Sequence, residues 1–317
     1  MPTPVSEMTR CLRDEPAGGE AIQVPRSALS YASPAMPRAQ RWFLFAIEQL
    51  AGIRRAERIY ATWRQSNPAT SRRPMNDLLA ACEMSLRIAA PHWPLERTEA
   101  RGLIIVANHP FGIPDGVAIL ALAEQLNRPV RILINNDLLR VPEMRRMALP
   151  IDFAETKAAV RTNLASRREA LACLARGETV VIFPGGGIAT APHPFGAAEE
   201  LPWKLFTAKL IHLSGADVLP VYFCGQNSPL FHAASRVSLF LRLSLILPEA
   251  VRRLGHPIEA RVGLLLRYEE LAPLSDRHLL TRYLYERVMA LGRRRRRPAA
   301  SQFARGGKLP SETPVAG

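Results

Sequence analysis

The chain has 317 residues, 48% of them hydrophobic, so it can bury one large core with a smaller appendage. Lys and Arg number 42 against 28 Asp and Glu, and the formal net charge of +14 implies an anionic partner, either nucleic acid or a membrane surface. No run of residues approaches the roughly 20 apolar positions of a spanning helix, and no signal-peptide pattern opens the chain, so we expect it to lie on a membrane rather than cross it. The four cysteines lack metal-ligand spacing, which predicts a reducing compartment and no metal site.

The N-terminal third predicts two different segments. Residues 1–37 are rich in Pro, Ala, Gly and Ser and are expected to be disordered. Residues 41–64 show helical spacing of aromatic and aliphatic side chains beside five arginines, typical of a helix at an anionic membrane interface. With a second helix at about 76–90, we expect a membrane-associating helical hairpin over 38–98; the alternative is an ordinary helix docked on the core. An α/β domain is expected over 99–292.

The stretch Leu103–Gly116 reads LIIVANHPFGIPDG and predicts a buried strand that ends in a loop, because Pro110 cannot donate to a sheet ladder. Asp115 is the predicted N-cap of the apolar helix that follows. His109 therefore lies past the carboxyl end of a core strand, where open α/β sheets bind ligands. A His–Asp pair suits general-base catalysis, since the carboxylate fixes the imidazole tautomer. The alternative is that Asp115 is only a helix cap and His109 only a loop residue.

Strands and helices alternate through the rest of the chain, which predicts a mixed, mostly parallel sheet flanked by helices. The polar residues Asn135 and Asp137 follow the strand predicted at 130–134, and they are either a turn and a helix cap or site residues. Gly177 is expected to cap the end of the helix predicted at 157–176. The apolar stretch 237–247 indicates core or an apolar surface. Predicted strands cover 130–134, 179–183, 217–223 and 259–267, and predicted helices cover 157–176, 200–213 and 275–291.

Glycines follow the strand at 179–183. The run Gly185–Gly187 lets the backbone approach a ligand closely and aim N–H groups at an anion. It matches none of the nucleotide-binding fingerprints. Asn227, after the strand at 217–223, reads equally as a turn residue or a site residue.

Five consecutive arginines, Arg293–Arg297, open a basic tail over 293–317 that we expect to be solvated and disordered. No aromatic interleaving or nucleic-acid module accompanies them, so the predicted partner is an anionic membrane surface and no nucleic acid. A nucleic-acid-binding function rests on charge alone, and it predicts steeply salt-dependent duplex binding.

The segment NHPFGIPDG resembles the first motif of the glycerophosphate and lysophospholipid acyltransferase superfamily, and within it the branch of haemolysin-like proteins and lyso-ornithine-lipid acyltransferases. Five residues separate His109 from Asp115. The same spacing is found in that branch, whereas most of the superfamily has four residues between the two. The resemblance continues in the region after Ile134, in Phe183–Gly187, in Leu219-Pro220-Val221 and in Asn227-Ser228. Gly185 stands where the third motif usually has glutamate, which leaves an acceptor contact to be supplied from elsewhere, for example by Thr190, His193 or Lys204.

The resemblance implies a glycerolipid-acyltransferase-like α/β fold with an N-terminal helical hairpin. It also implies transfer of an acyl group from an acyl-carrier-protein or coenzyme A thioester to the hydroxyl of a lyso-lipid, either lysophosphatidic acid or a lyso-ornithine lipid. His109 would be the general base and Asp115 would orient it, with no acyl-enzyme and no cofactor beyond the thioester co-substrate. The implied location is peripheral, at the cytoplasmic face of the inner membrane. The expected substrate-binding residues are Asn108, Pro110, Phe111, Gly112, Asn135, Asp137, Phe183, Pro184, Gly185, Gly186, Gly187, Thr190, Pro220 and Asn227.

Two alternatives to an acyltransferase stay open. The first is a membrane-lipid-binding protein of the same fold without catalysis, which the glycine at position 185 favours and the intact His–Asp pair opposes. The second is a thioester hydrolase, in which water replaces the lipid hydroxyl. No GxSxG nucleophile elbow occurs in the sequence, which agrees with direct transfer.

Overall fold

The computed structural model describes residues 29–30, 36–66, 70–95, 101–136, 139, 141–152, 154 and 156–293. The prediction of a disordered segment over 1–37 lies mostly outside these residues, as does that of a basic tail over 293–317. Asp137 also lies outside them.

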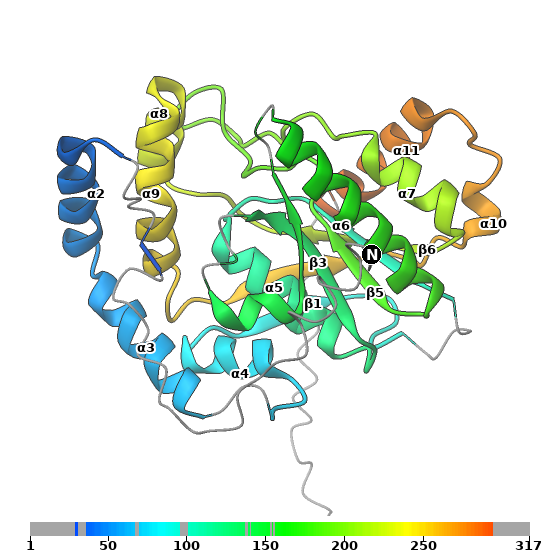
Figure 1. The fold of residues 1–317 in the computed structure, drawn as a ribbon, viewed down its shortest axis with the longest axis horizontal. Helices are drawn as coiled ribbons and strands as arrows, with labels where there is room; N and C mark the ends of the chain where they lie inside the picture. Colours follow the sequence, from blue (N-terminus) through cyan, green and yellow to red (C-terminus); the bar gives the residue numbers. More distant parts are fainter. Residues whose placement is uncertain are drawn as a thin grey trace, which may run out of the picture.

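In the described part of the chain, seven strands form one sheet in the order β1-β7-β6-β2-β5-β3-β4 (Figure 1). Neighbouring strands are parallel except β6 and β7, which pair antiparallel, so the predicted mixed, mostly parallel sheet is confirmed. The strands are β1 (Leu86–Ala89), β2 (Leu103–Ala107), β3 (Val130–Asn135), β4 (Ala148–Ile151), β5 (Thr179–Ile182), β6 (Asp217–Phe223) and β7 (Ile258–Val262).

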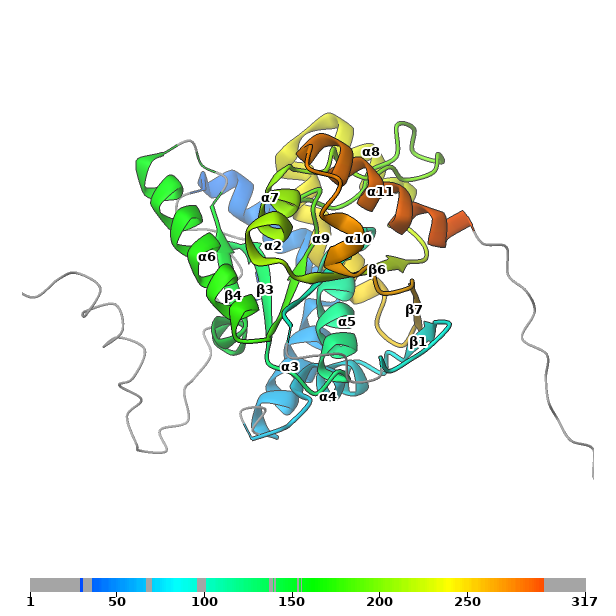
Figure 2. The same cartoon turned by 90° about the vertical axis from the view of Figure 1, so that its right-hand side faces the viewer.

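Helices cover both faces of the sheet, which explains the continuous apolar runs of its central strands (Figures 1 and 2). On one face Ile105 and Leu219 pack with Ile119 of α5 and with residues of α3 and α4. On the other face Ile104 packs with residues of α6, α7 and α11. The described helices are α2 (Arg38–Leu50), α3 (Ile53–Gln65), α4 (Pro74–Ala81), α5 (Ile113–Glu124), the 3-10 turn Pro142–Arg146, α6 (Lys157–Ala175), α7 (Phe206–Ser214), α8 (Pro229–Val237), α9 (Leu239–Arg252), α10 (Tyr268–Leu271) and α11 (Arg277–Arg293).

The N-terminal region differs from the predicted hairpin. The helix expected over 41–64 is broken at Gly52, whose φ of +83° favours glycine, and becomes α2 and α3. The second helix, expected at about 76–90, is wrong beyond Ala81. Glu83 turns the chain with φ +55°, and β1 then joins the sheet beside β7. The sheet therefore includes residues on the N-terminal side of position 98.

Two further differences bear on the site. The helix predicted from residue 200 begins only at Phe206, so residues 200–205 form a loop. The apolar stretch 237–247 lies mainly in α9, which packs beside α8 and α2 (Figure 1). Among the described residues, no helix has both the length and the apolar character needed to cross a membrane.

Candidate functional site

The side chain of Asn108 links the loop after β2 to the end of β6 by hydrogen bonds. Its side-chain amide donates to the Phe223 carbonyl at 3.0 Å, and its side-chain oxygen accepts the Phe223 N–H at 2.7 Å. Both polar groups of this buried side chain are therefore engaged within the protein. Asn108 is among the expected substrate-binding residues, and in the structure its side chain holds this loop to β6.

We expect Asn108→Ala to lower the free energy of unfolding by about 2–4 kcal/mol, because two hydrogen bonds are lost and the buried backbone groups of Phe223 are left unpaired. Urea denaturation measures the change. Exposed Gln65→Ala is the control and should stay within about 0.5 kcal/mol of wild type. An effect that small for Asn108→Ala would contradict the positioning role.

His109 and Asp115 meet at the start of α5. His109 Nδ1 lies 3.1 Å from Asp115 Oδ1, and the carboxylate is fully buried while the His109 side chain is 18% exposed. The other carboxylate oxygen of Asp115 accepts the Phe111 N–H at 2.8 Å, which fixes the carboxylate against the loop that precedes α5. With Nδ1 turned toward the carboxylate, Nε2 is the nitrogen left to take a proton.

The sequence predicts Asp115 as the N-cap of α5, and this is wrong: Asp115 lies within the first turn of the helix. Gly112 is the N-cap, with φ +87°, and a Cβ there would lie 2.6 Å from Ile188 Cδ1. Only glycine fits this position, and the sharp turn there brings Asp115 back toward His109. The five-residue spacing in the sequence is therefore compatible with a direct His–Asp contact.

The backbone of His109 is held on both sides. Its N–H donates to Glu200 Oε1 at 2.8 Å, and its carbonyl accepts the Ala189 N–H at 2.8 Å. Burial lowers the pKa of His109, but the Asp115 and Glu200 carboxylates outweigh burial and the charge of Arg242, so the pKa lies above its ordinary value. His109 is thus a stronger base than a free imidazole.

Phe183 stacks on the imidazole, with ring centroids 4.0 Å apart and planes inclined by 25°. The glycine run follows directly. Gly186 takes φ +70° in a turn closed by its N–H donating to the Phe183 carbonyl, and a Cβ on Gly187 would lie 2.8 Å from Leu201 Cδ1. The structure therefore brings Phe183 and the adjoining glycine loop to the histidine, as the sequence predicts.

Arg242 reaches the same loop from α9. Its guanidinium donates to the Ile188 carbonyl at 2.6 Å and to Thr190 Oγ1 at 3.2 Å. In the described part of the chain no carboxylate lies within ion-pair distance of Arg242, and burial lowers its pKa. Thr190 is thereby placed at the site, whereas the His193 and Lys204 side chains are exposed. A half-buried guanidinium without a carboxylate suits an anionic ligand.

Other residues expected to bind substrate lie elsewhere or inside the core. Phe111 is buried, beneath the Arg253 guanidinium at 4.5 Å, and Pro220 lies within β6. Asn135 ends β3, two strands away from β2 in the sheet. Asn227 is buried after β6, and neither polar atom of its side chain has a hydrogen-bond partner among the described residues. Pro110 and Pro184 are buried in the two loops that flank the histidine.

Sequence reasoning missed two charged residues of the site. Glu200 falls in the helix predicted over 200–213, and Arg242 falls in the apolar stretch 237–247, which is predicted to be core or an apolar surface. The arginine within VSLFLRLSLIL was a usable signal, because a single charge on an apolar helix needs a buried partner or a ligand. Nothing in the sequence singled out Glu200.

Comparisons with known proteins found a family model and two curated relatives. A family model described as "Acyltransferase" matches residues 44–278. The chain is 29% identical over 167 residues to a lyso-glycine lipid O-acyltransferase of Phocaeicola vulgatus, covering 51% of this chain and 56% of that protein. It is 28% identical over 164 residues to the enzyme of the same name from Bacteroides thetaiotaomicron, covering 51% and 57%. The alignments thus span about half the length of these curated relatives.

A solved structure, the 1-acyl-sn-glycerophosphate acyltransferase PlsC of Thermotoga maritima, aligns with 80% of this chain and 96% of its own. The sequence identity is 15% and the TM-score is 0.47.

Proposed function

The chain belongs to the acyltransferase family, and from this premise we propose that it moves a fatty acyl group from a thioester to the hydroxyl of a lyso-lipid. The proposed donor is an acyl-carrier-protein or coenzyme A thioester. The observation that carries the proposal is the 3.1 Å contact between His109 Nδ1 and the buried Asp115 carboxylate at the end of β2.

His109 Nε2 takes the proton of the lipid hydroxyl, and that oxygen attacks the thioester carbonyl carbon. The C–S bond then breaks, and the imidazolium returns the proton to the leaving sulfur. Asp115 stabilises the imidazolium between these steps. Backbone N–H groups of Gly185–Gly187, beside the ring of Phe183, are proposed to stabilise the negative charge that develops on the carbonyl oxygen.

The acceptor that fits the site has an anionic headgroup. Arg242 offers an uncompensated guanidinium at the Ile188–Thr190 loop, which directly follows the glycines. A carboxylate or a phosphate would match it. A lyso-glycine lipid, a lyso-ornithine lipid and lysophosphatidic acid all carry such a group, and the two curated relatives are named for the first.

Arg242→Gln is expected to raise the acceptor KM about 10-fold or more, because a charge-assisted hydrogen bond is worth about 1.5–3 kcal/mol. The donor KM should change little. Initial rates at varied acceptor and fixed donor measure this, with exposed Arg236→Gln of α8 as the control. Equal effects of Arg242→Gln on both KM values would argue against headgroup binding.

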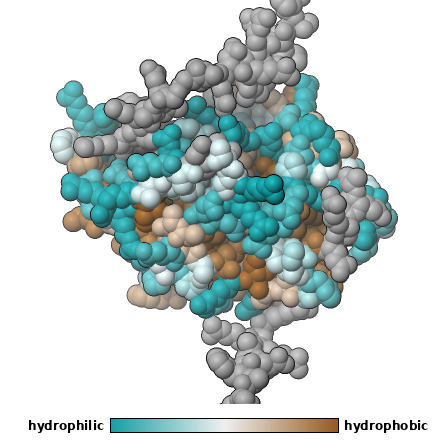
Figure 3. Space-filling view, turned by 90° about the horizontal axis from the view of Figure 1, so that it is seen from below, coloured by the Kyte–Doolittle hydropathy of each residue, from teal (hydrophilic) through white to brown (hydrophobic). Residues whose placement is uncertain are grey.

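We also propose that α2 rests on the cytoplasmic face of the inner membrane as a peripheral contact. Leu44 of this helix is buried, but most of its large apolar side chains face outward, with Trp42 72% and Leu50 89% exposed. Phe43 packs against Phe240 of α9, at 5.8 Å between ring centroids, so the exposed surface extends onto α9. The view from the α3–α4 side shows apolar patches between hydrophilic ones (Figure 3). Exposed arginines at positions 38, 41, 54 and 55 suit anionic headgroups.

Replacing Trp42 and Phe45 together by alanine is expected to weaken binding to anionic phosphatidylglycerol vesicles by about 10-fold or more. Burying one such side chain contributes about 1.5–3 kcal/mol to the free energy of binding. Vesicle co-sedimentation at fixed salt measures the partitioning. Leu213→Ala, an exposed leucine on α7, is the control. Binding that is equally strong in the double variant would place the membrane contact elsewhere.

The proposal is tested by offering the purified protein both classes of thioester with each of the three lyso-lipids and identifying products by mass spectrometry. We expect one acceptor to gain an ester-linked acyl chain. Free fatty acid alone would indicate a thioester hydrolase. Vesicle binding without turnover of any pair would indicate the non-catalytic alternative.

A further inference from the structure

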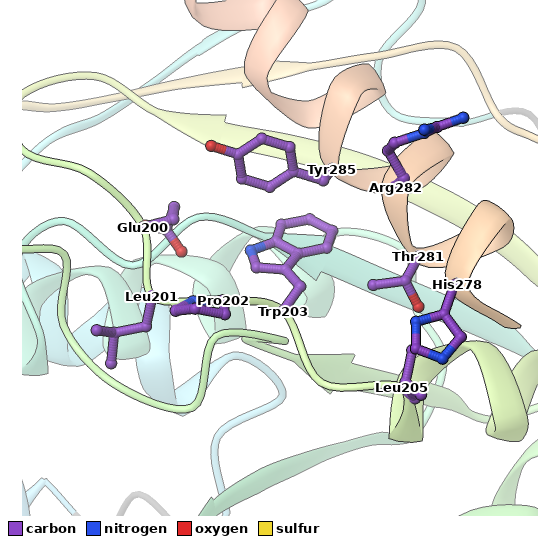
Figure 4. A pocket seen from close by; sticks show the side chains of 9 residues that line it. All are labelled: Glu200, Leu201, Pro202, Trp203, Leu205, His278, Thr281, Arg282 and Tyr285. Carbon is purple, nitrogen blue, oxygen red and sulfur yellow. The ribbon is translucent and has the colours of Figure 1, made fainter.

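Glu200 reaches His109 from a loop that precedes α7. Its Oε1 accepts the His109 N–H at 2.8 Å, although the two residues are 91 positions apart in the chain. Its Oε2 is buried and makes no hydrogen bond within the described residues. The indole nitrogen of Trp203 points toward this carboxylate, at one end of a pocket of about 310 Å³ that the loop forms with α11 (Figure 4).

The same carboxylate occupies the space beside Gly185. A Cβ added to Gly185 would lie 3.4 Å from Glu200 Oε2 and 3.1 Å from the Leu201 carbonyl oxygen. A side chain at position 185 would therefore enter the volume that Glu200 and Leu201 fill. The glycine and the distant glutamate fit together: the loop delivers a carboxylate to a place that residue 185 could otherwise reach itself.

Charged groups face the imidazole from three elements. Asp115 approaches from α5, Glu200 from the loop before α7, and Arg242 from α9. Tyr222 of β6 also lies near Glu200, and its pKa is raised by burial and by neighbouring charges that include Glu200. Burial raises the pKa of Glu200, and the His109 N–H, the His109 charge and the Trp203 indole oppose that rise. When ionised, Asp115 and Glu200 favour the imidazolium, and Arg242 opposes it.

We propose that Glu200 is a positioning residue for the base: it anchors the His109 backbone and places a second negative charge beside the ring. The anchor keeps Nε2 aimed at the acceptor hydroxyl, and the charge stabilises the imidazolium that forms when His109 takes the proton. The role in catalysis rests on the proposed function, whereas the effect on His109 itself does not require turnover.

The test is an NMR titration of the His109 ring in the whole protein, without substrate. Glu200→Gln keeps an oxygen that accepts the His109 N–H and removes the charge, so His109 should titrate at lower pH than in wild type. Glu199→Gln is the matched control, because Glu199 is the exposed neighbour. An unchanged His109 titration in Glu200→Gln would overturn the proposal, as would an equal displacement in the control.

Two further readouts separate the anchor from the charge. Glu200→Ala should speed hydrogen exchange of the His109 amide, while Glu200→Gln should leave it near the wild-type rate. In the acyl-transfer assay, Glu200→Gln should move the rise of kcat/KM to lower pH and reduce its plateau about 10-fold, because a weaker base transfers the proton less readily. If no acyl transfer is found but the NMR titration moves, the proposed function fails and the role of Glu200 stands. If kcat/KM of Glu200→Gln rises at the same pH and to the same plateau as in wild type, the proposed role of Glu200 in catalysis would be overturned.

Discussion

His109→Ala is expected to lower kcat/KM for acyl transfer by about 10²- to 10⁴-fold, the contribution of a well-placed general base. The imidazole is held by Asp115 on one side and by the Phe183 ring on its face, and the substitution removes the ring that is proposed to take the proton. Initial rates with saturating donor and varied acceptor measure the loss.

The control for this change is His193→Ala, since His193 is exposed. Both variants should retain the wild-type circular dichroism spectrum. A His109→Ala enzyme within 10-fold of wild type would mean that another group acts as the base.

Asp115→Asn is expected to cost about 10²-fold or more in kcat/KM while the protein remains folded. The amide oxygen of asparagine can still accept the Phe111 N–H, as the carboxylate does now at 2.8 Å. Its NH₂ would then face His109 Nδ1 and stabilise the tautomer that carries its proton on Nε2, which cannot act as a base.

The pH dependence supplies a second readout for Asp115→Asn. Because the carboxylate raises the pKa of His109, wild-type kcat/KM should rise with pH through a value above the ordinary histidine range and then level off. In Asp115→Asn the remaining rise should move to lower pH. Exposed Asp276→Asn, in the turn before α11, is the control. A wild-type profile in Asp115→Asn would remove the carboxylate from the mechanism.

The parts of the fold that the sequence predicts are those set by local patterns. The strands β2, β5 and β6 are apolar along their length because both faces of the sheet are covered, and that burial leaves runs that can be recognised without a structure. His109 lies in the loop after β2 and Asp115 in the first turn of the helix that follows, so their spacing in the sequence already limits how far apart they can be.

What the sequence does not show depends on contacts between distant segments. Glu200 meets His109 only because residues 200–205 remain a loop, while their composition also suits a helix. Arg242 comes to the glycine loop on α9, whose apolar stretch reads as core or surface when taken alone. Strand β1 is too short and too exposed for its alternation to outweigh a helical reading, and its pairing with β7 decides its structure.

The measurement that tests the central claim most directly is mass spectrometry of both lipid and intact protein in one quenched reaction with an acyl thioester and a lyso-lipid. Direct transfer with His109 as base predicts an O-acylated lipid and no acyl adduct on the protein. In His109→Ala it predicts no O-acylated lipid above background. A protein that carries the acyl group before the lipid does, or acyl transfer that persists in His109→Ala, would contradict it.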